Sequence, residues 1–279
     1  MSRRRPAGAR GERSSAYWND VASGSEQGAP PLWRLHADRA TLALLEGWWP
    51  AGRCARVLKT DLYDESRTRG LVPALAERAD VVVGIDVSTV VARRAAAGGP
   101  VLVVTSDVRA LPFGAGAFDV VMSNSTLDHF RAKGEIGRAL RELERVLAAD
   151  GSLLLTLDNP RHPLLALRTM LAPIWRRLGL VPYPLGATYG ARELREALVA
   201  SGFTVEALTA VHHFPRIALV AAQRLLPVAL GERLLRIADR AERCGAWPTR
   251  FVTGQYVAAL ARPTRGCASQ QATDRHAAA

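Results

Sequence analysis

The chain has 279 residues, of which 48% are hydrophobic and 23% are charged, and this composition is ordinary for a globular protein with a large core. It excludes a wholly disordered chain, and no apolar run reaches the length of a membrane-spanning helix. The three cysteines form no CxxC pair, so we predict neither a zinc site nor a disulfide framework and expect a cytoplasmic location.

The net charge of +11 comes mainly from two segments. Residues 1–13 carry five arginines and one glutamate, and residues 161–250 carry 13 arginines and six acidic residues. We expect residues 1–15 to form a disordered basic tail, residues 16–262 a single domain, and residues 263–279 a second disordered tail. A protein that acts on nucleic acid through a basic arm is the less favoured alternative, because no nucleic-acid module accompanies the charge.

Short apolar runs alternate with helical patterns along the domain. The pattern KGEIGRALRELERVLA, for example, places Ile136, Leu140, Leu143 and Leu147 at helical spacing. In chain order we predict strands at 56–58, 81–85, 101–104, 118–122, 152–157, 203–208 and 254–261, with helices at 71–78, 88–97, 133–148 and 191–201. Continuous apolar strands alternating with helices predict a parallel sheet covered on both faces, with ligands bound at the carboxyl ends of the strands.

The loops at these strand ends carry the polar residues. The run 81–85 ends in Asp86, and a carboxylate in that place suits the two hydroxyls of a ribose. Capping of the next helix is the alternative role, although Ser88 is equally suited to capping. The third run is followed by SDVRALPF, with Asp107 in its second position, and the fourth by SNSTLDHF.

In order and spacing, these loops resemble those of class I S-adenosylmethionine-dependent methyltransferases. The resemblance implies a Rossmann-like α/β fold, with a seven-stranded, mostly parallel sheet, an antiparallel last strand and a helical lid. It also implies S-adenosylmethionine as the cofactor. Asp86 and Val87 are expected to bind its ribose, and Asp107 and Val108 its adenine. Asn124 and Ser125 are expected to line the floor under its methyl group.

The first loop departs from this family, in which a glycine-rich turn usually follows the first strand. Here the sequence after the run 56–58 is KTDLYDE, and the first glycine is Gly70. It is similar to a divergent K-T-D-L-[FY]-D/E variant of some bacterial members. Lys59 then holds the usual acidic position, Asp61 is expected to contact the ammonium of the cofactor, and Thr60 its carboxylate. The missing glycines leave open a protein that binds the cofactor without transferring methyl groups.

Asp128 and His129 are the titratable pair expected near the transferred methyl group. A histidine can take a proton from a hydroxyl or an amine as it is methylated. Packing or capping is the alternative role for His129, because positioning alone often suffices for methyl transfer. Tyr17, with Trp18, resembles the helical segment that closes over the cofactor in this family.

Two insertions, at about 160–190 and 210–250, combine apolar residues with arginines and are expected to form a lid over the substrate. We predict methyl transfer to an oxygen or nitrogen of a small molecule, of hydrophobic or anionic, secondary-metabolite or lipid-like character. Contact of the same insertions with acidic lipid, as a peripheral membrane surface, is the other interpretation. The histidines lack metal-ligand spacing, so no metal site is predicted.

Overall fold

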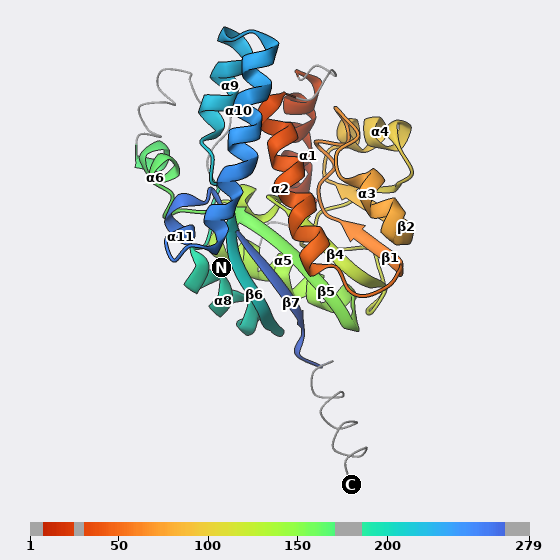
Figure 1. The fold of residues 1–279 in the computed structure, drawn as a ribbon. Coiled ribbons are helices and arrows are strands. Elements are labelled where there is room, and N and C mark those ends of the chain that lie inside the picture. Colours follow the sequence, from red (N-terminus) through yellow and green to blue (C-terminus); the bar gives the residue numbers. More distant parts are fainter. Residues whose placement is uncertain (1–7, 25–30, 171–185, 266–279) are drawn as a thin grey trace.

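The computed structural model describes residues 8–24, 31–170 and 186–265. Seven strands form one sheet in the order β3-β2-β1-β4-β5-β7-β6 (Figure 1). Neighbours among the first five strands are parallel, and β7 pairs antiparallel with both β5 and β6. This confirms the predicted mostly parallel sheet. The strands are β1 (Cys54–Lys59), β2 (Ala79–Asp86), β3 (Leu102–Thr105), β4 (Phe118–Asn124), β5 (Leu147–Asp158), β6 (Phe203–Val211) and β7 (Tyr256–Pro263).

Helices cover both faces of the sheet because the central strands are apolar on both sides. In β1, for example, Val57 and Leu58 are fully buried in different clusters, as expected for consecutive residues of a strand. One cluster joins the sheet to α5 (Lys133–Val146) and α8 (Ala191–Ala200). The other joins it to α3 (Val72–Arg78) and to the end of α2 (Leu32–Trp48).

Local signals set the ends of these helices. Ser88 caps α4 (Thr89–Gly98) by accepting a hydrogen bond at Oγ from the Val91 N–H at 3.2 Å. Helix α5 buries Ile136, Leu140 and Leu143 completely, in agreement with the predicted apolar stripe. Gly202, with a φ of 91°, ends the turn after α8 in the left-handed region that favours glycine.

The remaining helices stand above the carboxyl ends of the strands (Figure 1). Helix α1 (Gly8–Ser23) contacts α4, and α2 contacts both α9 (Arg216–Leu225) and α10 (Val228–Ala241). The short helices α6 (Pro163–Met170), η2 (Glu242–Ala246) and α11 (Arg250–Thr253) complete the described parts of the two insertions. The expected disorder of residues 1–15 needs correction, because α1 begins at Gly8. Its later turns pack on α4, and this contact fixes the helix.

A close contact between the first loop and β2 decides where that loop lies. Leu62 is fully buried against Gly84, at which a built Cβ atom would lie 2.6 Å from Cδ2 and 2.8 Å from Cδ1 of Leu62. Only glycine leaves room for this side chain. The close approach that a glycine-rich turn usually provides is thus shifted here from the loop to the neighbouring strand.

We expect Gly84→Ala to lower the free energy of unfolding by about 1–3 kcal/mol, because the added methyl group overpacks the buried Leu62. The double variant Gly84→Ala, Leu62→Ala should lose less free energy of unfolding than the sum of the losses in the two single variants. Gly114→Ala is the matched control, since no atom lies within 4 Å of its built Cβ. Urea denaturation of the four variants tests this, and equal effects of Gly84→Ala and Gly114→Ala would contradict the proposed contact.

Candidate functional site

Backbone and side-chain hydrogen bonds join the loops at the strand ends into one surface. The Ser106 N–H donates to the Asp86 carbonyl at 3.0 Å, and the Leu62 N–H donates to Asp86 Oδ2 at 3.2 Å. The Thr60 hydroxyl donates to Ser123 Oγ at 3.0 Å. The loops after β3, β2, β1 and β4 are therefore linked in the order of the strands, as the parallel topology requires.

A buried ion pair shapes the first loop. Lys59 Nζ lies 3.0 Å from Glu65 Oε2 and also donates to the Asp61 carbonyl, and Glu65 Oε1 accepts from the Leu71 N–H at 3.0 Å. Burial works to lower the pKa of Lys59, but Glu65 and then Asp61 outweigh it and hold this pKa above its ordinary value. Both hydrogen-bond partners of the Lys59 ammonium in the described chain, Asp61 and Glu65, belong to the first loop, so Lys59 positions this loop. A direct contact of Lys59 with a ligand stays a prediction.

Asp61 lies where negative charge is in excess. Its Oδ1 accepts a hydrogen bond from the Tyr63 N–H at 3.0 Å. Burial, and after it the neighbouring Asp86, raises the pKa of Asp61 from 3.8 to about 6. Lys59 opposes this rise, but it is already paired with Glu65. A bound cation beside Asp61 would relieve the repulsion.

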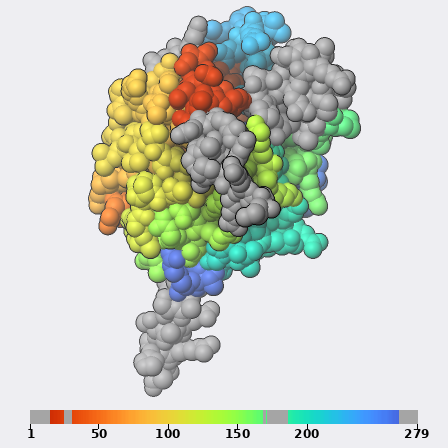
Figure 2. Space-filling model, turned by 180° about the vertical axis from the view of Figure 1, so that it is seen from behind, coloured from red at the N-terminus to blue at the C-terminus, as the bar shows by residue number. Residues whose placement is uncertain are grey.

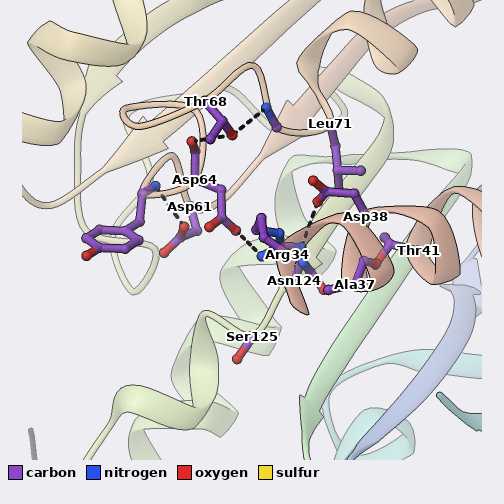
Figure 3. Close-up of polar contacts among 12 residues, drawn as sticks. Arg34, Ala37, Asp38, Thr41, Asp61, Asp64, Thr68, Leu71, Asn124 and Ser125 are labelled. Atoms are coloured by element: carbon purple, nitrogen blue, oxygen red, sulfur yellow. Dashed lines mark hydrogen bonds and ion pairs between the residues drawn. The ribbon is translucent and has the colours of Figure 1, made fainter. Parts of the chain in front are cut away.

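Arg34 joins helix α2 to the first loop. Its guanidinium lies between Asp64 Oδ2 at 2.6 Å and Asp38 Oδ1 at 2.7 Å, and the side chain is buried (Figure 3). Our sequence analysis missed Arg34. The one signal available was its i,i+4 spacing to Asp38, which does not reveal a partner 30 residues further along the chain.

Asp86 and Ser88 have different roles at the end of β2, since Ser88 caps the next helix and Asp86 does not. Asp86 Oδ1 accepts from the Ser88 N–H at 2.8 Å, while the Ser88 hydroxyl caps α4. Each oxygen of Asp86 accepts one backbone hydrogen bond and retains a lone pair for a further donor. Asn19 of α1 reaches the same place, accepting from Ser88 Oγ at 2.7 Å. Tyr17 and Trp18 thus belong to a helix fixed on this edge, and Val87 lies between the two polar residues.

The loop after β3 contains a second, partly buried charge network. Arg109 Nε lies 2.9 Å from Asp107 Oδ1, and its guanidinium also pairs with Glu135 at 2.6 Å. Burial raises the pKa of Asp107, but the hydrogen bonds from Arg109 outweigh it and leave this pKa below its ordinary value. Asp107 is therefore ionised, and Arg109 holds both of its oxygens, while the adjacent Val108 is buried.

The loop after β4 is fixed to β5. Asn124 Oδ1 accepts from the Thr156 hydroxyl at 2.5 Å, and the Ser125 N–H donates to the Thr156 carbonyl at 3.1 Å. Ser125 has a φ of 50°, which is uncommon for a residue other than glycine and marks a constrained turn. The Ser125 hydroxyl in turn donates to Asp128 Oδ2 at 2.9 Å.

The two carboxylate oxygens of Asp128 differ in their hydrogen bonding. Its Oδ2 accepts from Ser125 and from the Asp158 N–H at 2.9 Å, whereas the buried Oδ1 has no hydrogen-bond partner in the described chain. His129 Nε2 lies 4.0 Å from this Oδ1, and the His129 ring packs edge-on against Trp18 at 4.9 Å. The structure thus brings the predicted pair together beneath α1.

Two other buried polar residues, His36 and Asn159, have structural partners. His36 is buried between Asp239 Oδ1 at 3.0 Å and Glu242 Oε1 at 3.1 Å, so it joins α2 to α10 and η2. Asn159 Nδ2 donates to the carbonyls of Phe251 and Gly254 at 2.9 and 2.8 Å. Within residues 8–24, 31–170 and 186–265, no group of three or more His, Cys, Asp or Glu could hold a metal ion.

Comparison with known proteins agrees with this arrangement. Residues 67–155 match the family model described as a methyltransferase domain. The match begins after the first loop, so it does not include Lys59 to Glu65. No curated protein matches the sequence of this chain.

Solved structures extend the likeness across the chain. Geranyl diphosphate C-methyltransferase from Streptomyces coelicolor A3(2) superposes with a TM-score of 0.58 at 18% identity, covering 92% of this chain and 100% of its own. An S-adenosylmethionine-dependent methyltransferase from Mesorhizobium loti has a TM-score of 0.52 at 18% identity, with coverages of 80% and 97%. The [4+2]-cyclase SpnF has a TM-score of 0.53 at 19% identity, with coverages of 92% and 94%. The chain therefore has the fold of class I S-adenosylmethionine-dependent methyltransferases, and its residues 67–155 match the model of a methyltransferase domain.

The raised pKa of Asp61 leads to a prediction for the free protein. A carboxyl whose folded pKa is raised contributes stability below its unfolded pKa of 3.8, and this contribution is lost as the pH rises through about 6. Asp61→Asn removes the charge and should stabilise the protein by about 2–3 kcal/mol at a pH of about 8. Its advantage should vanish near pH 4, roughly the pKa of the unfolded aspartate.

Urea denaturation at both pH values measures this difference. Asp20→Asn, at an exposed position of α1, is the matched control and should change the free energy of unfolding little at either pH. If Asp61→Asn destabilises the protein at the higher pH, the excess of negative charge in the first loop is not the dominant effect there.

Proposed function

We propose that this protein transfers a methyl group from S-adenosylmethionine to an oxygen or nitrogen of a small-molecule acceptor. The observation that carries the proposal is the acidic end of β1, where Asp61 and Asp86 repel each other and Lys59 is committed to Glu65. The α-ammonium of the cofactor has the charge that this place lacks. Asp61 would hold it by a charge-assisted hydrogen bond.

The other predicted cofactor residues fit the remaining parts of the molecule. Asp86 would accept both ribose hydroxyls on the lone pairs that its backbone partners leave, with Val87 beside it. Asp107 and Val108 would bind the adenine, and Asn124 and Ser125 would line the methyl-bearing side. Thr60 is the weakest assignment, because its hydroxyl donates to Ser123 and its N–H to the Met122 carbonyl. Contact with the cofactor carboxylate would require an exchange of these bonds.

Asp128 and His129 would act on the acceptor. The bound cofactor supplies a methyl group on a positively charged sulfur, open to in-line attack. Asp128 Oδ1 would accept the hydrogen bond of the acceptor O–H or N–H, which relieves a buried oxygen that otherwise costs about 1–3 kcal/mol. As the methyl group is transferred, the proton of the acceptor would pass through Asp128 Oδ1 to His129 Nε2, which lies 4.0 Å from this oxygen, while Tyr17 and Trp18 of α1 exclude water.

The acceptor class follows from the lid. Helices α6, α9 and α10 carry apolar residues interspersed with arginines and stand above the strand ends (Figure 1). A hydrophobic or anionic small molecule of secondary-metabolite or lipid-like type suits such a surface. The part of this lid in residues 171–185 lies outside the described residues.

A cofactor-binding protein without methyl transfer is the second candidate. The glycine-poor first loop favours it, and the similarity to a [4+2]-cyclase shows that the fold is not confined to proteins named as methyltransferases. Formation of S-adenosylhomocysteine with a panel of phenols, carboxylic acids and amines separates the two. Binding of the cofactor without turnover on any acceptor would favour the second candidate.

Asp86→Ala should weaken S-adenosylmethionine binding by about 2–4 kcal/mol, because two charge-assisted hydrogen bonds to the ribose are lost. Asp80→Ala, at the exposed start of the same strand, is the matched control and should bind like the parent. Calorimetric titration with S-adenosylmethionine and with S-adenosylhomocysteine measures both variants. Unchanged affinity in a folded Asp86→Ala protein would remove Asp86 from the site.

Asp128→Asn preserves shape and should lower the rate of methyl transfer roughly 10²-fold or more without changing cofactor affinity. His129→Ala should lower the rate of methyl transfer, because the final proton acceptor is removed. Rates are followed as S-adenosylhomocysteine formed from the best acceptor of the panel. If His129→Ala retains the rate of the parent at every pH, His129 is a packing residue.

A further inference from the structure

The exposed apolar surface of this protein is concentrated on the lid. Thirteen large hydrophobic side chains are exposed in the described chain, and all but Leu102 and Val199 lie in the two insertions. Single exposed apolar residues are ordinary, but a contiguous set marks a surface that contacts something else. The eleven are Leu164, Leu167, Met170, Ile217, Leu225, Leu226, Val228, Leu230, Ile237, Trp247 and Val252.

The most exposed of these side chains lie at the connection between α9 and α10. We define the α9–α10 turn as residues 223–230, every one of which is exposed. Leu225 and Val228 are 78% and 79% exposed. Seen from behind, the light-blue atoms of the α9–α10 region form the top of the molecule (Figure 2). The turn can therefore meet a flat surface without obstruction from the sheet.

Unpaired positive charge accompanies this apolar turn. Five arginines on α9, α10 and η2 are exposed and have no hydrogen bond or ion pair from their side chains within the described chain, namely Arg224, Arg233, Arg236, Arg240 and Arg243. Glu232 is the one exposed acidic residue of these three elements. Asp239 and Glu242 instead contact His36 of α2.

We propose that the α9–α10 turn binds an anionic lipid surface. Leu225, Leu226 and Val228 would enter the interfacial region, and Arg224 and Arg233, the two of these arginines nearest to the turn along the chain, would contact the phosphate groups beside them. A nucleic acid would use the arginines but leave these aliphatic side chains exposed, since it binds through phosphate contacts and base stacking. Of the helices that the structure describes, none combines the length and apolar character that a bilayer crossing requires, so this contact is peripheral.

The proposal does not depend on methyl transfer. It rests on exposure and charge in the lid, whereas the proposed function rests on the first loop. Helix α10 packs against α2, which carries Arg34 of the site.

Flotation of the full-length protein with vesicles tests the proposal. We expect binding to vesicles of phosphatidylcholine mixed with phosphatidylglycerol, little binding to phosphatidylcholine alone, and weaker binding as salt is raised. Arg224→Gln with Arg233→Gln should reduce affinity roughly 30-fold. Leu225→Ser with Val228→Ser should reduce it roughly 10- to 100-fold.

Val199→Ser with Arg195→Gln is the matched control, because it removes one exposed apolar and one exposed basic side chain from α8. It should bind vesicles as the parent does. Circular dichroism and cofactor titration confirm that each variant is folded. Equal vesicle binding by the parent and both turn variants would overturn the proposal. So would a parent dimer that the Leu225→Ser, Val228→Ser variant converts to a monomer in the absence of lipid, because the turn would then cover a second copy of the chain.

Discussion

The buried pair of Lys59 and Glu65 is the interaction on which the first loop depends. A pair of charges removed from water is favourable only when its remaining hydrogen-bonding groups are satisfied. Here Glu65 also accepts the Leu71 N–H and Lys59 also donates to the Asp61 carbonyl, so the pair fixes the loop at both ends. The loop then needs no glycine-rich turn, and its polar groups face the end of β2.

Two further contacts complete this substitute for a glycine-rich turn. Leu62 fills the space beside Gly84 and so joins the loop to β2. Arg34 joins the loop to α2 through Asp64. The loop is thereby packed against the sheet by Leu62 and held on the side of α2 by Arg34. The result is a concentration of carboxylates held close together by backbone bonds, with an unfavourable charge balance that the fold tolerates because the surrounding contacts are strong.

The sheet was predictable because its signals are local. Continuous β-branched runs, polar strand ends and one strongly amphipathic helix establish the order of elements, and the resemblance supplied the antiparallel last strand. The contacts of the site were less predictable. Arg34 and Asp64 are 30 residues apart, and Asn19 meets Ser88 across 69 residues, so no spacing rule could pair them. The start of α1 at Gly8 was also missed, because the Arg-, Gly- and Ser-rich composition there carries no apolar pattern of a helix.

Cofactor affinity and the stability of the free protein are opposed in this site. Each carboxylate that suits a cationic or hydroxyl-rich ligand raises the free energy of the empty loop, since burial and like charge disfavour ionised Asp61. A glycine-rich loop avoids this cost by offering backbone N–H groups, which carry no net charge. The acidic loop instead gains more from a ligand that brings its own positive charge. In the proposed function, the residues that would select the ammonium end of the cofactor are therefore the same ones whose like charges disfavour the loop without a ligand.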